Sequence, residues 1–264
     1  MKLAVSNLAW SDPATLPRLA ASGVAGIEIA PTRIAPWDSL TPATLAACRH
    51  AAEAANLAIC SLQAIFYGVP GAQLLGDDAG FAAMAGHLRH VAAIAAALGA
   101  RIAVFGAPNN RRRHALGEPA ATALATARLR RLGDIAAPAG LAIALEPVPP
   151  AYGGDFLPCA SDVVRLVDAV AHPAIRVHLD TGCALLAADP IAPAIHQAGP
   201  ALAHFHAQEP GLGPFAAPRA EHQAAAAALR DINYPGWVVL EMREQPDPWP
   251  ALEQAIRHAR AIYG

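Results

Sequence analysis

Short apolar runs recur along the chain, separated by longer stretches rich in alanine, leucine and arginine. The runs lack strict alternation of polar and apolar residues, which is typical of parallel strands buried on both faces. The strands are expected to begin near Leu3, Gly26, Leu57, Arg101, Leu141, Ile175, Leu202 and Trp237. The stretches between them favour helices. The pattern therefore predicts a strand–helix unit repeated eight times.

Local signals mark several of the predicted helix starts. A capping side chain or a first-turn proline precedes a helical stretch in Ser11-Asp12-Pro13, Thr41-Pro42, Asp77-Asp78, Ser161-Asp162 and Asp189-Pro190. Such residues accept hydrogen bonds from the free N–H groups of a helix or fix its first turn. We therefore expect helices to start at these points.

Eight units predict one (β/α)8 TIM barrel covering residues 1–264 as a single domain, close to the typical length of ~250 residues. The alternative is a doubly wound open sheet. No GxGxxG motif follows the first predicted strand, and no linker or low-complexity segment divides the chain. The barrel is the better interpretation.

Composition narrows the classes of function. Hydrophobic residues make up 55% of the chain and charged residues 15%, so a large core is expected and disorder is not. The net charge of -2 argues against a nucleic-acid partner. The longest apolar stretches are interrupted before the ~18 residues that would span a membrane, so no membrane segment is expected. Four cysteines without a CxxC pair favour a reduced, cytoplasmic protein.

Four metal-ligand side chains follow the last four predicted strands: Glu146, Asp180, His206 and Glu241. In a TIM barrel the carboxyl ends of all strands meet at one face, where the active site lies. Each residue alone fits a structural ion pair or a core histidine equally well, but four at one level favour a shared site. Carboxylates and an imidazole suit one divalent ion, Mn²⁺ or Mg²⁺, with Co²⁺ or Zn²⁺ also open because of the histidine.

Further polar residues near the strand ends are predicted to contact a substrate. They are Asn7, Gln63, Asn109, Arg111, His178, Cys183, His204, Glu209 and Arg243. Arg111 opens a run of three arginines and a histidine. Such a run is either a solvated surface or a site for a phosphate or carboxylate group of the substrate.

Five fragments, in the order GIEIAP, LEPVP, HLDTG, HFHAQE and VVLEMRE, carry a resemblance. Together they resemble the xylose-isomerase-like TIM-barrel superfamily of sugar and sugar phosphate isomerases and epimerases. The resemblance implies that Glu146, Asp180, His206 and Glu241 bind the metal ion. It also implies that Glu146 and Glu241 are the catalytic acid and base, and that Glu28 organises the bottom of the site. A homo-oligomer and a small carbohydrate-like substrate, anionic or neutral, are the implied partners.

One position departs from the superfamily pattern. A histidine commonly stands three residues after the aspartate of strand six, and here Cys183 stands in that place. We interpret Cys183 as a packing or supporting residue, with a softer-metal ligand as the alternative. The expected function is a metal-dependent isomerase or epimerase that removes a proton next to a carbonyl and passes through an enediolate. A dehydratase or lyase with the same metal site and a non-catalytic ligand-binding barrel remain open.

Overall fold

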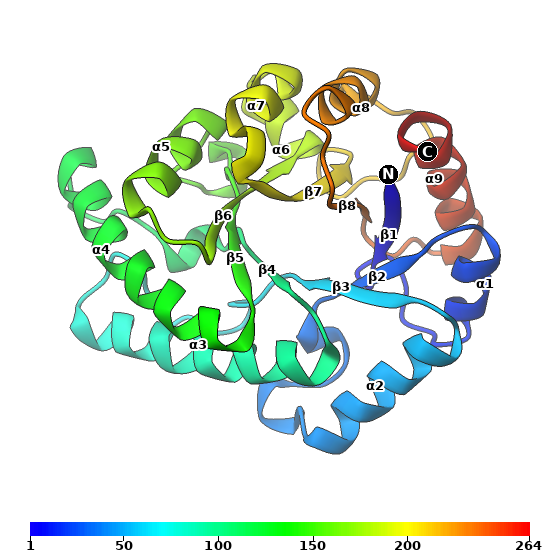
Figure 1. Ribbon diagram of the computed structural model, residues 1–264, viewed down its shortest axis with the longest axis horizontal. Helices are drawn as coiled ribbons and strands as arrows, with labels where there is room; N and C mark the ends of the chain where they lie inside the picture. Colours follow the sequence, from blue (N-terminus) through cyan, green and yellow to red (C-terminus); the bar gives the residue numbers. More distant parts are fainter.

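Eight parallel strands form a closed barrel in sequence order (Figure 1). The computed structural model describes residues 1–264. The strands are β1 Lys2–Ser6, β2 Gly26–Ile29, β3 Ala58–Leu62, β4 Ile102–Phe105, β5 Ala142–Leu145, β6 Ile175–Asp180, β7 Leu202–Gln208 and β8 Trp237–Glu241. Each begins within one residue of its predicted start. Because β1 pairs with both β2 and β8, the sheet has no free edge, and the predicted TIM barrel is confirmed.

A ring of helices surrounds this barrel (Figure 1). The helices are α1 Thr15–Ala21, α2 Pro42–Ala54, α3 Asp78–Leu98, α4 Glu118–Ala136, α5 Ala160–Val170, α6 Thr181–Leu186, α7 Ile191–Ala198, α8 His222–Asp231 and α9 Pro248–Tyr263. One crossover, between β6 and β7, contains two helices rather than one. The main core is a cluster of 75 buried residues, which joins the outward face of the barrel to the inward faces of the helices, and a second cluster consists of Ala4, Cys60 and Val239.

Two of the predicted caps are confirmed, and two have other roles. The side chains of Thr41 and Asp77 accept hydrogen bonds from Thr44 N (3.2 Å) and Gly80 N (2.7 Å) at the starts of α2 and α3. Asp12 instead bonds Ala14 N in a turn before α1, which starts later than predicted. Asp189 accepts from Ala160 N (2.7 Å), so it caps α5 rather than the helix that follows it in sequence.

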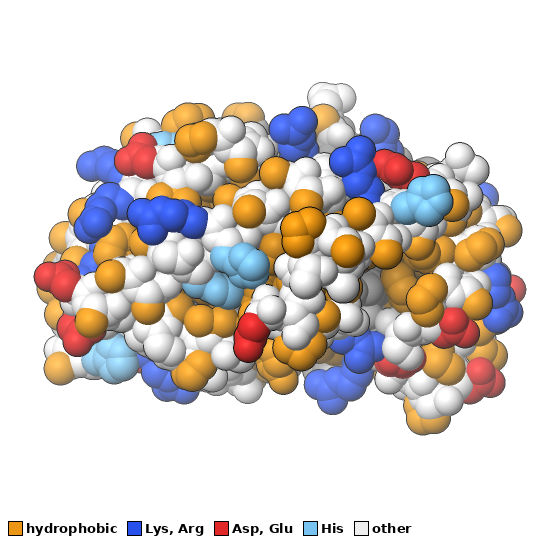
Figure 2. Space-filling model, turned by 90° about the horizontal axis from the view of Figure 1, so that it is seen from below, with side chains coloured by type: hydrophobic (Ala, Val, Ile, Leu, Met, Phe, Trp, Pro, Cys, Tyr) orange, Lys and Arg blue, Asp and Glu red, His pale blue; other side chains and the backbone are white.

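The surface carries charges of both signs among many apolar side chains. On the face in Figure 2, Lys and Arg lie interspersed with Asp and Glu, as a net charge of -2 with 15% charged residues suggests. By length and composition alone α3 is apolar enough to cross a membrane, but half of that stretch is buried inside the structure. A helix packed against a barrel has the same composition.

Candidate metal centre and cavity

The four strand-end residues meet at the carboxyl end of the barrel. The ligand atoms of Asp180, His206 and Glu241 lie within 4.8 Å of one another, and Glu146 comes equally close to Asp180. His206 Nδ1 lies 3.3 Å from Glu241 Oε2 and 3.8 Å from Asp180 Oδ2. Parallel strands bring these side chains together because each ligand ends or follows a strand at the same level.

Three atoms of this cluster are buried without a hydrogen bond: Asp180 Oδ2 and the two ring nitrogens of His206, of which Nε2 lies against the Glu28 carboxylate. A buried polar atom of this kind is costly unless something binds it. The other oxygen of Asp180 accepts from Cys183 N at 2.6 Å, which fixes the carboxylate and leaves Oδ2 directed at the cluster. Three carboxylates and one imidazole with free lone pairs fit a divalent cation.

The crowded carboxylates of the cluster favour the binding of protons or of a cation, because either one reduces their mutual repulsion. Burial and the neighbouring charge of Glu241 raise the pKa of Glu146 to about 7. Burial, with Glu241 and Glu146 close by, also raises the pKa of Asp180 well above its usual range. Burial opposes charge on His206, but the Glu28 and Glu241 carboxylates outweigh it and raise its pKa. A cation would replace protons held by these groups.

Glu28 lies beneath the cluster and fixes the orientation of His206. Glu28 Oε1 is 2.9 Å from His206 Nε2, while Oε2 is 2.7 Å from both His204 Nε2 and Ser61 Oγ. Burial disfavours the charge of Glu28, but His206 and His204 lower its pKa. A proton on His206 Nε2 directed at Glu28 leaves Nδ1 for the cation. The register of the β2–β3 pairing shifts between Ile27 and Glu28.

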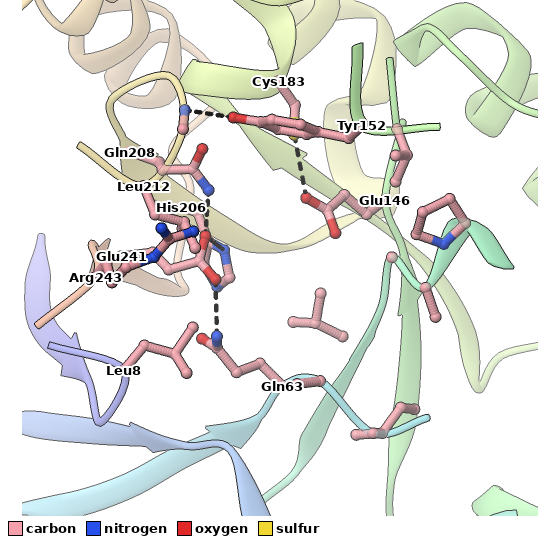
Figure 3. Close-up of a pocket in the computed structure, with 18 residues that line it drawn as sticks. Leu8, Gln63, Glu146, Tyr152, Cys183, His206, Gln208, Leu212, Glu241 and Arg243 are labelled. Carbon is pink, nitrogen blue, oxygen red and sulfur yellow. Dashed lines mark hydrogen bonds and ion pairs between the residues drawn. The ribbon is translucent and has the colours of Figure 1, made fainter. Parts of the chain in front are cut away.

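Two glutamines hold Glu241 from opposite sides (Figure 3). Gln63 Nε2 donates to Glu241 Oε1 at 2.7 Å, and Gln208 Nε2 donates to Oε2. Gln63 is among the residues predicted from the sequence, and Gln208 is not. Its position two residues after His206, on the same face of β7, was the available signal.

A cavity of about 370 Å³ opens above the cluster, with Glu146 and Glu241 on opposite sides (Figure 3). Of the predicted substrate contacts, Gln63, Cys183 and Arg243 line it. Cys183 Sγ donates to Glu146 Oε1 at 3.5 Å, and burial raises the pKa of its thiol well above the usual range. These contacts support the interpretation of Cys183 as a supporting residue.

The other predicted substrate contacts lie outside the cavity wall. His178 and His204 are buried below it, with their ring centroids 5.3 Å apart. Asn7 brackets the backbone of Ala30, and its Oδ1 accepts from Ala30 N at 2.7 Å. Asn109 accepts from the side chain of Arg112.

Arg111 and Glu209 also have internal partners. Arg111 is 1% exposed and donates from Nη2 to the backbone oxygen of Glu146 at 2.6 Å. Burial lowers its pKa to about 10. Glu209 accepts from His222 Nε2 (2.8 Å) and Arg219 N (2.8 Å). Neither side chain lines the cavity, because the loops that carry them turn these groups inward.

Several cavity residues had no signal in the sequence. Tyr152, in the loop after β5, accepts from Gly211 N in the loop after β7, which joins the two loops. Gly106 follows β4, and a Cβ at this position would collide with Glu146 Oε2. Such contacts depend on loop paths that hydrophobic periodicity does not describe.

Similar proteins have related folds. The family described as xylose isomerase-like TIM barrel matches residues 16–262. A D-psicose 3-epimerase of Agrobacterium fabrum (strain C58) is 34% identical over 115 residues, which are 42% of this chain and 38% of that epimerase. The chain thus matches less than half of the length of this relative.

Solved structures extend the similarity to the whole chain. A crystal structure of D-psicose 3-epimerase in the presence of D-fructose superposes with a TM-score of 0.83 at 21% identity, covering 100% of both chains. A probable 3-DHS dehydratase from Bacillus anthracis gives a TM-score of 0.77 at 14% identity, covering 98% and 99% of the two chains. At these identities the structures show a common fold. With a family match over nearly all of its length and a closed eight-stranded barrel, the chain belongs to the xylose isomerase-like TIM barrel family.

Proposed function

We propose that the chain is a divalent-metal-dependent isomerase or epimerase of a small hydroxy-carbonyl compound. One observation carries the proposal: Glu146 and Glu241 lie on opposite sides of a cavity whose floor is a cluster of metal-ligand side chains (Figure 3). A carbon atom held between two carboxyl groups can lose a proton to one and regain it from the other.

The two glutamates then have complementary roles. One carboxylate accepts the proton from the carbon next to the carbonyl, and the other carboxyl group donates a proton to the opposite face of that carbon. The substrate is thereby inverted without net loss or gain of atoms. Gln63 and Gln208 keep the Glu241 carboxylate fixed during this exchange.

Glu146, Asp180, His206 and Glu241 would hold the metal ion. When bound, Mn²⁺, Mg²⁺, Co²⁺ or Zn²⁺ would polarise the substrate's carbonyl and hydroxyl oxygens and stabilise the negative charge left by proton removal. The match to a D-psicose 3-epimerase supports a ketose or a related hydroxy-ketone as the substrate class.

The first test measures metal content and proton exchange on the same preparations. Mass spectrometry should find near-stoichiometric metal in the wild type and a reduced content in Asp180→Asn. In D₂O, NMR should show deuterium entering a ketose or hydroxy-ketone, with a loss of on the order of 100- to 10,000-fold in Glu146→Gln and Glu241→Gln. Glu253→Gln, an exposed glutamate on α9, is the matched control. Full exchange in either site variant overturns the acid/base assignment.

A dehydratase or lyase is the second candidate, because it would use the same first proton abstraction. The fold similarity to a probable 3-DHS dehydratase keeps it in view. Ultraviolet absorbance of an unsaturated carbonyl product would favour this reaction. Deuterium in recovered substrate without such absorbance would favour the isomerase. A protein that takes up none of the four metals would instead support a non-catalytic barrel.

A further inference from the structure

We infer that Arg111 is a positioning residue for the proposed reaction: its buried guanidinium holds the end of β5 and thereby fixes the Glu146 carboxylate at the metal cluster. The inference rests on the proposed function and deepens it, because it adds a residue that acts through one of the two carboxylates. It comes from the contacts of the guanidinium, which lies outside the cavity wall.

The side chain of Glu146 is held less firmly than that of Glu241 (Figure 3). The Glu241 carboxylate accepts hydrogen bonds from two amide groups, those of Gln63 and Gln208. Glu146 Oε1 accepts one, from the thiol of Cys183 at 3.5 Å, and a thiol is a weak donor. The direction of the Glu146 carboxylate therefore depends on the position of its backbone.

The backbone of Glu146 is anchored at both its N–H and its carbonyl oxygen. The N–H donates to Phe105 O at 3.2 Å. The next residue is Pro147, which has no N–H to continue the strand pairing. The carbonyl oxygen of Glu146 accepts from Arg111 Nη2 at 2.6 Å. Hydrogen bonds from charged donors are among the strong ones, so Arg111 fixes the point from which the Glu146 side chain leaves the strand.

Stability of the fold alone does not account for an arginine in this place. Arg111 is 1% exposed, and its Nε and Nη1 are buried without a hydrogen-bond partner. Its one bonded nitrogen contacts a backbone oxygen and not a carboxylate. A buried charge with unpartnered donors is costly, and an apolar side chain of similar size is often neutral or better for stability.

The charge of Arg111 also acts on Glu146. Burial lowers the pKa of Arg111, and attraction from the Glu146 carboxylate is the main effect that opposes this shift. The charged groups that act on Glu146 in turn are Glu241, His206 and Arg111. The guanidinium therefore offsets part of the repulsion between the two glutamates and helps to keep both carboxylates at the cluster.

The first experiment measures the geometry of the metal centre without a substrate. Bound Co²⁺ has visible absorption bands that depend on the arrangement of its ligands. In Arg111→Met, which removes the charge and the donors, Glu146 should shift. We expect altered bands and Co²⁺ binding weaker by on the order of tenfold. Bands and affinity identical to those of wild type overturn the inference.

The second experiment measures kcat and KM of the Co²⁺-loaded protein for proton exchange in D₂O, with D-fructose and dihydroxyacetone. Arg111→Met should lower kcat by on the order of 10- to 100-fold with KM little changed, because the displaced carboxylate reacts slowly once the substrate is bound. Arg111→Lys keeps the charge and a donor, so its kcat should lie between the other two. A higher KM with unchanged kcat would mean that Arg111 contacts the substrate, and the positioning role would be wrong.

Arg128→Met separates positioning from a structural role. Arg128 is 6% exposed, and from α4 it donates to two backbone oxygens, Leu74 O (2.9 Å) and Gly76 O (2.7 Å). Its replacement should lower the urea midpoint of unfolding and leave the Co²⁺ bands and kcat as in wild type. Arg111→Met should keep or raise that midpoint. A midpoint lowered as far as in Arg128→Met, with wild-type bands and kcat, would make Arg111 a structural residue.

Failure of the proposed function would give a different result. If metal-loaded wild type exchanges no proton of either compound, while the Co²⁺ bands differ between wild type and Arg111→Met, the proposed function is contradicted. Arg111 then still positions Glu146 at the metal ion.

Discussion

Replacing Glu28 by glutamine removes one buried negative charge and keeps the size of the side chain. Glu28 is fully buried and contacts Ser61, His204 and His206 at 2.7–2.9 Å. An amide has one oxygen acceptor instead of two, so at least two of these three charge-assisted contacts weaken. At about 1.5 kcal/mol each, the loss is about 3 kcal/mol, near the lower end of the ~3–5 kcal/mol known for breaking buried ion pairs.

The same change should loosen His206 and weaken metal binding. Loss of a residue that orients a metal-binding histidine typically costs about 10- to 100-fold in affinity. Urea unfolding of the metal-free protein, followed by circular dichroism, measures the stability. Calorimetric titration with Mn²⁺ measures the affinity.

Ser61→Ala is the matched control for Glu28→Gln. It removes one contact of Glu28 but none of His206, so stability should fall by about half as much and metal affinity should hold. If Glu28→Gln lies within 1 kcal/mol of wild type, the reasoning about the buried charge is refuted. If it binds Mn²⁺ as tightly as wild type, Glu28 does not position His206.

Three further predictions concern the scaffold. Gly106→Ala should push the Glu146 carboxylate aside, which should weaken metal binding and lower kcat for proton exchange by on the order of 100-fold; unchanged kcat would contradict the close approach. Leu88 is a fully buried residue of α3, and Leu88→Ala should lower the free energy of unfolding, measured in urea, by about 2–5 kcal/mol. A loss under about 1 kcal/mol would mean that neighbouring side chains fill the space left by the leucine. Burial lowers the pKa of His222, so the neutral ring's contribution is complete above the unfolded pKa of about 6.5 and is lost as the pH falls through the folded value. The stability difference between wild type and His222→Asn should therefore shrink from pH 7.5 to 5.5, and a constant difference would contradict this.

The barrel and the cluster of candidate metal ligands could be predicted from the sequence for a physical reason. Buried parallel strands are uninterrupted apolar runs, so a run such as LAIAL fixes both the strand and the level at which Glu146 emerges. Because all strand ends meet at one face, the four candidate ligands could be placed together without knowledge of any loop.

The cavity walls and the loop arginine were not readable in this way. Tyr152 and Leu212 belong to loops whose paths are set by contacts such as the Tyr152–Gly211 bond. Arg111 looked like a surface or anion-binding residue, yet its loop folds it beneath Glu146. A charge run in sequence carries no information about which of its members turns inward.

The hydrogen bond from Gln63 to Glu241 joins residues 178 positions apart and crosses from the loop after β3 to the end of β8. Contacts of such large sequence separation form only after the intervening chain has paid its loop-closure entropy. The last strand must therefore dock between β7 and β1 before Glu241 is oriented. During folding, a species that has already collapsed and gained most of its helices would therefore not yet catalyse proton exchange. In refolding kinetics, the onset of proton exchange would thus report closure of the barrel. It should come later than helix formation, which circular dichroism follows.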